Sequence, residues 1–202
     1  MIAIIDYGMG NLHSVQKAVE RLGYGALVTS REEEILAADG AILPGVGAFG
    51  DAMQFLNDTG LGQAAVRYAA GGKPLLGICL GMQLLFSSSE EHGQHEGLGL
   101  LPGRVVRIVG DFKVPHMGWN RLSFKQPSPL LAGLTEGHAY FVHSYKALPE
   151  REQDLLADTD YYGPVTAVVG RDNVFGTQFH PEKSGELGMK LLENFLRLTV
   201  RG

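Results

Sequence analysis

The sequence has little cysteine, little tryptophan and no long apolar run. Among its 202 residues, Cys79 is the only cysteine and Trp119 is the only tryptophan. A single cysteine excludes an internal disulfide, and it fits either a reducing compartment or a thiol kept for its reactivity. No apolar stretch approaches the roughly 20 residues that a membrane-spanning helix requires. The first residues contain no basic segment followed by a long apolar run, so we expect a strand there and not a signal peptide.

Positive charge is also scarce. The chain has 17 Lys and Arg against 22 Asp and Glu, which gives a formal net charge of −5. This balance gives no support for a nucleic-acid partner or for an anionic membrane surface. With 45% hydrophobic and 19% charged residues, the composition is that of an ordinary globular protein. We expect one domain over residues 1–202 in a cytoplasmic protein.

The two halves of the chain differ in their periodicity. In the first half we expect strands over 2–5, 26–29, 41–43 and 75–78, and helices from residue 11, over 32–36, 48–56 and 61–70, and from 81 to 86. This alternation predicts a parallel sheet with helices on both faces. In the second half, strand-like segments at 104–108, 121–124, 140–145, 165–169 and 174–179, the last two a hairpin, precede a helix over 187–198. We therefore predict an α/β fold, a three-layer domain with a mixed, mostly parallel central sheet flanked by helices and an antiparallel-rich second half.

A nucleophile-elbow pattern surrounds the only cysteine. Gly77-Ile-Cys-Leu-Gly81 lies between a buried strand and a helical pattern, with Cys79 where hydrolases have serine. A sharp turn holds such a nucleophile in a strained conformation, and glycines two residues away relieve the crowding. The helix N-terminus that follows directs N–H groups at the reacting centre. The alternative is a small buried hydrophobic Cys79, but the two glycines favour chemistry.

A base and its orienting carboxylate follow near the end of the chain. In the segment Thr177-Gln-Phe-His-Pro-Glu182, His180 and Glu182 are two residues apart, so in an extended chain they face the same side. A histidine can take the thiol proton, and a carboxylate can fix the tautomer of that histidine. Alone, His180 reads as a loop histidine beside a salt-bridging glutamate; together with the elbow it indicates a catalytic triad. The other histidines lack the spacing of metal ligands, so we expect no metal site and no cofactor.

These motifs resemble those of a known family. Gly77-Ile-Cys-Leu-Gly-Met-Gln83, His180-Pro-Glu182 and Pro44-Gly-Val-Gly47 match the class I, or triad, glutamine amidotransferases. More narrowly, segments 6–11, 44–47, 115–120, 140–145 and 180–184 are similar to the glutaminase subunits of imidazole glycerol phosphate synthases. The resemblance covers essentially the whole chain and keeps the order of the motifs. It implies the fold predicted above and a glutaminase activity.

The resemblance also implies roles for individual residues. Cys79 would attack the side-chain amide of glutamine, His180 would pass a proton to the leaving ammonia, and Glu182 would orient His180. The backbone N–H of Leu80 and one from the Val46-Gly47 peptide would hold the oxyanion. The glutamine-binding residues would be Gly45, Gln83, Glu91, His143, Ser144 and Tyr145. The last three would border the α-carboxylate through backbone or hydroxyl contacts; the alternative for them is a core position in an aromatic-rich strand. For Glu91, which would bind the α-ammonium, the choice over the adjacent Glu90 rests on motif alignment alone.

The family delivers its ammonia to a second subunit. The resemblance implies a heterodimer with a (βα)8-barrel cyclase that makes imidazole glycerol phosphate and the aminoimidazole-carboxamide nucleotide of the histidine pathway. We expect Asn11, Trp119, Asn120 and Lys183 at the interface, with Trp119 in a loop; the alternative for Trp119 is a core position. The glycines of Gly45-Val46-Gly47 would let the adjoining peptides rotate and switch the oxyanion hole on when the partner binds its nucleotide.

Three other functions remain open from sequence alone. The first is a glutaminase subunit for anthranilate, aminodeoxychorismate, pyridoxal phosphate or guanylate synthesis, which the Gly-Val-Gly loop and the Trp119 segment disfavour. The second is a non-catalytic binding subunit of the same fold, which the intact Cys79, His180 and Glu182 disfavour. The third is a cysteine protease or chaperone with a similar elbow, which would not need the His-Pro-Glu spacing.

Overall fold

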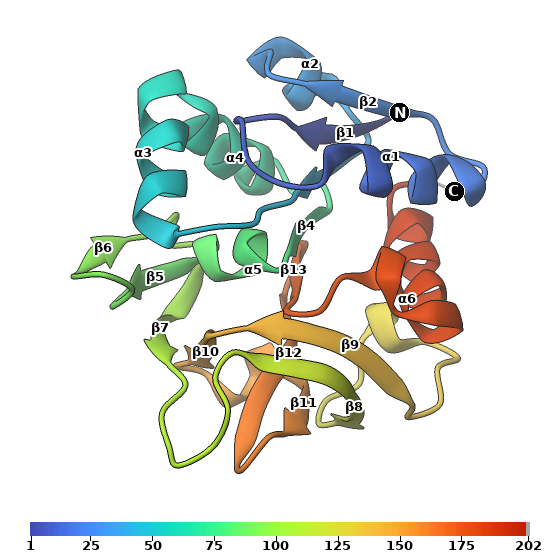
Figure 1. Cartoon of the computed structure of the whole chain (residues 1–202). Coiled ribbons are helices and arrows are strands. Elements are labelled where there is room, and N and C mark those ends of the chain that lie inside the picture. Colours follow the sequence, from blue (N-terminus) through green and yellow to red (C-terminus); the bar gives the residue numbers. More distant parts are fainter. Residues whose placement is uncertain (201–202) are drawn as a thin grey trace.

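The computed structural model describes residues 1–200, and its elements alternate between strand and helix in the first half of the chain (Figure 1). That half forms β1 (Ile2–Ile5), α1 (Leu12–Arg21), β2 (Ala26–Thr29), α2 (Glu32–Ala37), β3 (Gly40–Leu43), α3 (Phe49–Thr59), α4 (Leu61–Ala70), β4 (Leu75–Ile78) and α5 (Leu80–Leu84). Residues 201 and 202, which belong to the domain expected over 1–202, lie outside the described residues.

The second half is mostly strand. It forms β5 (Phe86–Ser89), β6 (His95–Glu96), β7 (Leu101–Arg107), β8 (His116–Phe124), β9 (His138–His143), β10 (Tyr145–Pro149), β11 (Leu155–Asp160), β12 (Pro164–Arg171) and β13 (Val174–Thr177), then α6 (Gly185–Leu198). Single 3₁₀ turns occur at Pro129–Leu131, Glu152–Asp154 and Pro181–Lys183. The expected hairpin is present, because β12 and β13 pair antiparallel with Arg171 opposite Val174.

The predicted mixed sheet is confirmed. Nine strands follow the order β2-β1-β3-β4-β13-β12-β11-β8-β9. The pairs from β2 to β13 are parallel, and those from β13 to β9 are antiparallel. Strand β13 therefore joins the two halves, since it pairs with β4 on one edge and with β12 on the other.

Helices cover both faces of the parallel half. Residues Ile35, Leu56 and Tyr68 of α2, α3 and α4 pack into one buried apolar cluster. Residues Val19 and Phe195 of α1 and α6 pack into the other, and Figure 1 shows these two groups of helices on opposite sides of the strands. Strand β1 is buried at all four positions, as expected for a parallel strand covered on both faces. This arrangement is the three-layer fold that the sequence predicts.

Helix α1 illustrates how the local sequence specifies its element. Its apolar residues Leu12, Val15 and Val19 follow the 3.6-residue period, and Val15 and Val19 are buried against the sheet. The Asn11 side chain accepts a hydrogen bond from the Ser14 N–H at 3.4 Å, which caps the first turn.

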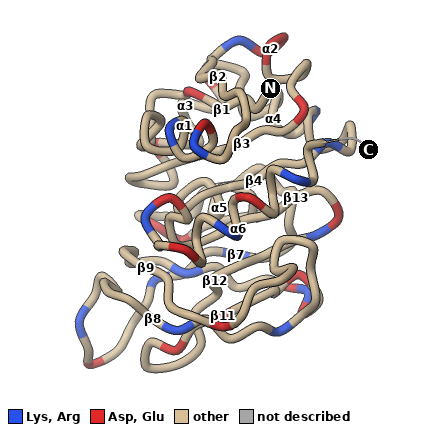
Figure 2. The backbone as a smooth tube through the Cα atoms, turned by 90° about the vertical axis from the view of Figure 1, so that its right-hand side faces the viewer, with Lys and Arg blue, Asp and Glu red and all other residues tan. Residues whose placement is uncertain are grey.

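Figure 2 shows acidic and basic residues interspersed along the backbone. Among residues 1–200, no helix has the length and apolar character needed to cross a membrane.

The structure also contains a second, smaller sheet that the sequence analysis did not predict. Its four strands follow the order β10-β7-β5-β6. The helix after Cys79 is shorter than expected, because α5 ends at Leu84 and Phe86 already begins β5.

The prediction of a loop at Trp119 is wrong, since Trp119 lies in β8 opposite Tyr140 of β9. The side chain of this tryptophan still lies on the surface, with 56% of it exposed, because alternate residues of a strand point to opposite faces.

Candidate active site

Cys79 occupies a strained turn between β4 and α5. Its backbone has φ 58° and ψ −114°, a region that residues with a side chain rarely adopt. Holding such a residue there costs about 1–3 kcal/mol, and this strain concentrates at functional sites. Cys79 is the residue that precedes the first turn of α5. The thiol therefore lies beyond the end of a parallel strand, the edge at which α/β folds place their ligands.

The two glycines of the elbow are required by close backbone contacts. A Cβ atom at Gly77 would lie 2.6 Å from the carbonyl oxygen of Gly81. A Cβ atom at Gly81 would lie 1.8 Å from the carbonyl oxygen of Leu43, the last residue of β3. The turn packs so tightly between β3 and β4 that no side chain fits at either position. The sequence motif thus has a steric cause as well as a conformational one.

His180 and Glu182 follow β13, the strand next to β4. The Nδ1 atom of His180 lies 2.9 Å from Oε1 of Glu182, and the two side chains are only 8% and 3% exposed. Burial lowers the pKa of His180, but the interactions with Cys79 and Glu182 outweigh it and raise that pKa to about 9. An imidazolium beside the thiol favours the thiolate, which is the nucleophilic form. The second carboxylate oxygen of Glu182 is buried without a hydrogen bond in the described structure.

Two buried glutamines connect the nucleophile to the small sheet. The Nε2 atom of Gln178 lies 3.8 Å from the Cys79 sulfur. Gln83 donates from Nε2 to the Tyr145 carbonyl at 3.1 Å and to Oε1 of Gln178 at 3.0 Å. Both N–H groups of the Gln83 amide are thereby used, which leaves its carbonyl oxygen for a ligand. The sequence analysis missed Gln178, although it stands between Thr177 and His180 in the segment that supplies the base.

The loop expected to form the oxyanion hole holds a carbonyl beside the elbow. The Leu80 N–H, an expected oxyanion donor, donates to the Gly45 carbonyl at 3.3 Å. Gly47 has φ 105°, and Val46 between the two glycines is 46% exposed. The hydroxyl of Tyr7 donates to the Pro44 carbonyl at 2.7 Å and fixes the start of the loop. In this arrangement the Leu80 N–H is occupied by the Gly45 carbonyl.

The expected substrate residues share one pocket with the nucleophile. A cavity of about 480 Å³ is lined by Val46, Gly47, Cys79, Leu80, Gln83, Glu91, His92, Arg107, Val142, His143, Ser144, Tyr145 and His180. Gly45, expected to bind the substrate, and Glu182 are not among the residues that line it. Glu91 is 8% exposed, and its Oε2 accepts a hydrogen bond from the Phe49 N–H at 3.4 Å. Burial raises the pKa of Glu91, with that hydrogen bond acting against it.

Two histidines form a hydrogen-bonded chain on the far wall of this pocket. His143 Nδ1 lies 2.8 Å from the Tyr145 carbonyl, and its Nε2 lies 3.0 Å from Nδ1 of His116. His116 Nε2 in turn lies 2.8 Å from Oδ1 of Asn120, whose amide donates to the Asp160 carbonyl. The Tyr145 carbonyl can only accept, so the proton of His143 lies on Nδ1 and its Nε2 accepts at the contact with His116. Burial lowers the pKa of His116, and it lowers that of His143 to about 4, so both rings are neutral at pH 7.

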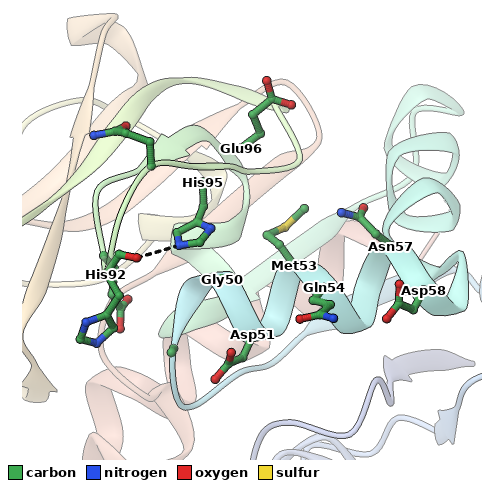
Figure 3. Close-up of a pocket in the computed structure, with 12 residues that line it drawn as sticks. Gly50, Asp51, Met53, Gln54, Asn57, Asp58, His92, His95 and Glu96 are labelled. Atoms are coloured by element: carbon green, nitrogen blue, oxygen red, sulfur yellow. Dashed lines mark hydrogen bonds between the residues drawn. The ribbon is translucent and has the colours of Figure 1, made fainter.

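A larger cavity of about 630 Å³ lies beside the first and shares Glu91 and His92 with it (Figure 3). It lies between α3 and the segment 91–96. His95 packs over Gly50, where a Cβ atom would lie 2.7 Å from the imidazole. This cavity contains neither Cys79 nor His180, so its size does not make it the reaction site. Within residues 1–200, no group of His, Cys, Asp and Glu is arranged to hold a metal ion.

The expected interface residues come from the N-terminal end of α1, from β8 and from the 3₁₀ turn Pro181–Lys183. Asn11 and Lys183 are exposed. The exposed Trp119 ring packs on Tyr140, with the ring centroids 5.7 Å apart. Asn120 is half-buried, and its side chain is used in the histidine chain described above.

Comparison with known proteins gives consistent matches. A family model described as glutamine amidotransferase class-I matches residues 3–198. The chain is 59% identical to the imidazole glycerol phosphate synthase subunit HisH of Geobacillus thermodenitrificans (strain NG80-2), over 99% of this chain and 97% of that protein. It is also 59% identical to the subunit of the same name from Geobacillus kaustophilus (strain HTA426), over 100% and 99% of the two chains. A crystal structure of a glutamine amidotransferase, 21% identical, superposes with a TM-score of 0.76 over 98% of both chains, which is a likeness of fold.

Proposed function

This chain belongs to the class I glutamine amidotransferases, and on that premise we propose that it is the glutaminase subunit of an imidazole glycerol phosphate synthase in histidine biosynthesis. The observation that carries the proposal is that Cys79 and His180 line one pocket while Glu182 contacts His180 from outside its lining. Cys79 stands at a strained elbow, His180 lines the same cavity, and Glu182 lies 2.9 Å from His180. The high identity to the named synthase subunits over nearly the full chain supports the narrower assignment over other glutaminase subunits.

The reaction begins with the thiolate of Cys79. It attacks the side-chain carbonyl carbon of glutamine and forms a tetrahedral oxyanion. His180, charged by the proton of the thiol, donates that proton to the amide nitrogen, the C–N bond breaks and ammonia leaves. His180 then takes a proton from water, whose oxygen attacks the thioester and releases glutamate. Glu182 keeps the proton of His180 on Nδ1 and stabilises the imidazolium.

Assembly of the oxyanion hole is the event that would require a signal from the partner subunit. The Leu80 N–H must leave the Gly45 carbonyl before it can serve an oxyanion. Rotation of the peptides around Val46 would free that N–H and add a second donor, and the loop contains glycine on both sides of Val46 to permit it. A missing oxyanion donor costs about a hundred- to a thousand-fold in rate. We therefore propose that the free subunit is nearly inactive.

The signal would come from a (βα)8-barrel cyclase bound as a heterodimer. Gly10, at the end of the 6–11 segment, packs against the oxyanion loop so closely that a Cβ atom there would lie 3.2 Å from the Gly45 nitrogen. Asn11 follows directly and is exposed. A partner that contacts Asn11 could therefore shift the loop through a single layer of backbone contacts. Lys183 follows Glu182 and would contact the same partner, with Trp119 as the apolar anchor.

A three-state activity measurement tests the proposal. Glutamate release is measured for the isolated chain, for the complex with the cyclase, and for the complex with the nucleotide ligand of the cyclase. We expect a rise of at least about a hundred-fold in kcat only in the third state. Equal turnover in all three states would show a preformed oxyanion hole, and no turnover in any state would refute the glutaminase assignment. A glutamyl thioester on Cys79 after mixing with glutamine would exclude a non-catalytic binding subunit.

A further inference from the structure

The sulfur of Cys79 lies beside a buried amide that none of the roles above uses. Gln178 directly follows β13, and it is only 1% exposed. Its Nε2 lies 3.8 Å from the Cys79 sulfur. Cys79 and His180 are among the residues that line the 480 Å³ cavity, and Gln178 is not. Gln178 therefore contacts the sulfur from within the protein and not from the side on which a ligand would bind.

A fixed backbone carbonyl decides which end of this amide faces the sulfur. The Tyr145 carbonyl can only accept, so the nitrogen of the Gln83 amide must face it, at 3.1 Å. The second N–H of that nitrogen is directed at the Gln178 amide, at 3.0 Å, and it requires an oxygen there. The oxygen of Gln178 consequently faces Gln83, and its NH₂ group faces Cys79. A donor, and not an acceptor, therefore lies next to the sulfur.

The position of this donor does not depend on the oxyanion loop. The backbone N–H of Gln178 donates to the Ala167 carbonyl of β12 at 2.8 Å, and the N–H of Cys79 donates to the Thr177 carbonyl of β13 at 2.7 Å. Neighbouring strands of the nine-stranded sheet thus hold both residues, and the loop of residues 44–47 does not. We expect the contact between amide and sulfur in the isolated chain as well as in an activated complex.

A donor in this position favours negative charge on the sulfur. Hydrogen bonds to an ionised acceptor are shorter and roughly twice as strong as those to a neutral one, so the 3.8 Å contact should tighten when the thiol loses its proton. The sulfur is negative before it attacks glutamine and again when water breaks the thioester. His180 exchanges protons in these steps. The Gln178 amide keeps its own protons, so it stabilises the charge without neutralising it.

We propose that Gln178 is a further catalytic residue, whose amide N–H binds the Cys79 thiolate and keeps the sulfur turned towards the substrate. This inference rests on the proposed glutaminase function and adds a residue that touches the reacting atom. The contacts of Gln83 with Tyr145 and with Gln178 would keep this donor aimed at the sulfur.

The first test follows thiolate formation in the isolated chain by ultraviolet absorbance. Cys79 is the only cysteine, so the difference between each protein and its Cys79→Ser counterpart reports this thiol alone. Gln178→Met has a side chain of similar length without a donor. Its thiolate signal should appear about one pH unit higher than that of the wild type, which corresponds to a ten-fold change in equilibrium. A Gln178 amide that only supported Gln83 would leave the signal unchanged.

The second test measures glutamate release by the nucleotide-activated complex. Gln178→Met should lower kcat about ten-fold, the loss expected for one hydrogen bond to a charged group. Its KM should stay within about three-fold of the wild-type value, because Gln178 is not part of the cavity lining. An unchanged kcat with a raised KM would mean that Gln178 acts only by holding Gln83, and that result would overturn the proposal.

The matched control is Asn194→Leu. Asn194 is another buried amide, 5% exposed, and it donates to the carbonyls of Leu130 and Ala132 at 2.9 Å. Neither Asn194 nor its partners line the cavity, so this variant should lower stability without changing the thiolate signal or kcat. Thermal unfolding checks that both variants are folded. An equal shift of the thiolate signal in Asn194→Leu would show a general loosening and would also overturn the proposal.

A third measurement needs no substitution at Gln178. In nuclear magnetic resonance spectra of the wild-type chain, a side-chain N–H of Gln178 should move to lower field as the thiolate forms, and that of the exposed Gln153 should not. An unchanged Gln178 resonance, or an unchanged thiolate signal in folded Gln178→Met, would refute the inference. Each of these results leaves the glutaminase assignment standing, provided that the wild-type complex releases glutamate. A wild-type complex that releases none would refute the proposed function itself.

Discussion

The parallel and antiparallel halves of the nine-stranded sheet carry their functional groups in different ways. In the parallel half, β1, β3 and β4 are buried throughout, and the candidate catalytic groups lie just beyond strand ends, as Cys79 after β4 and His180 after β13 do. In the antiparallel half, the polar groups lie within the strands. His116 of β8 and His143 of β9 face each other across the sheet at 3.0 Å.

This difference follows from how each half is covered. Strands covered on both faces leave only their ends for polar chemistry, because an unpaired polar group in the middle would be buried. Antiparallel strands can leave one face accessible, and here β8 and β9 alternate between buried and more exposed side chains, whereas β12 is buried along most of its length. The parallel half therefore holds the candidate chemistry in short contiguous motifs. In the antiparallel half, the exposed side chains and the hydrogen-bonded histidines lie in cross-strand pairs, whose members are distant in sequence.

The largest effect should come from a parallel-half strand end. Cys79→Ala should lower kcat for glutamine hydrolysis by at least about four orders of magnitude, since residues that act as one unit lose nearly all their effect together. Val142→Ala changes a side chain that lines the same pocket from β9, and it should lower kcat less than ten-fold. Glutamate release by the activated complex measures both. Substantial ammonia production by Cys79→Ala would refute the assignment of the nucleophile.

A comparison of unfolding free energies tests the same contrast between the parallel half and the second half of the chain. Gly81→Ala would place a Cβ atom 1.8 Å from the carbonyl oxygen of Leu43, whose backbone is fixed by its pairing with β4. We expect it to lower the unfolding free energy by about 3 kcal/mol or more. Gly133→Ala is the control in the second half of the chain, where φ is 71° and nothing lies within 4 Å.

For that control we expect a loss of about 1 kcal/mol, from backbone strain alone. Urea unfolding of the two variants gives both values. Equal losses would mean that the elbow relaxes and that its tight packing is not required for folding.

The antiparallel half should matter for association. Trp119→Ala should weaken binding of the cyclase about ten- to a hundred-fold, as truncation of a central tryptophan anchor does. The stability of the isolated chain should change by less than about 0.5 kcal/mol, because the ring is 56% exposed. Phe55→Ala removes a ring that is 49% exposed on α3 and should not alter binding. Calorimetry measures both affinities, and a loss of thermal stability with normal binding would contradict an interface role for Trp119.

The smallest effect concerns two histidines whose pKa values are shifted in opposite directions. The pKa of His180 is raised to about 9, so its stabilising contribution is complete below pH 6.5 and is lost as the pH rises through 9. The pKa of His143 is lowered to about 4, so its neutral form favours folding above pH 6.5, and this contribution is lost as the pH falls through 4.

Each slope should be at most about 1.4 kcal/mol per pH unit. Urea unfolding at several pH values measures them. His180→Asn should flatten the alkaline limb of the stability profile, and His143→Asn should flatten the acid limb. A variant that changed both limbs equally would show that the two sites are coupled.

The contrast between the parallel and antiparallel halves also explains which features could be predicted from the sequence. The elbow, the alternation of strands and helices in the first half and the hairpin before His180 follow from motifs in which every participating residue is within a few positions of the next. The small sheet does not follow from such local motifs. It brings Arg107 of β7 opposite Tyr145 of β10 and places Glu90 against the Arg107 backbone. Nothing in the local pattern of those segments specifies their register, because register depends on long-range packing.

Trp119 and Gln178 were misjudged or missed for related reasons. Gly118 and Asn120 beside Trp119 are typical of turns, but pairing with β9 overrides that propensity and makes the segment a strand. Gln178 gave no signal as an isolated residue, since its importance comes from lying between the Cys79 sulfur and the Gln83 amide. Local propensity fails where tertiary pairing decides the conformation.

The central position of β13 has a consequence for the chain as it is being made. This strand is the last to be synthesised, yet it alone joins the parallel strands to the antiparallel ones, and it leads directly to His180. A growing chain on the ribosome therefore exposes Cys79 long before its base exists. Because domains assemble as translation proceeds, a prematurely terminated product would contain the thiol but could not consume glutamine. Competence to generate ammonia thus arrives only after the chain has been synthesised through His180.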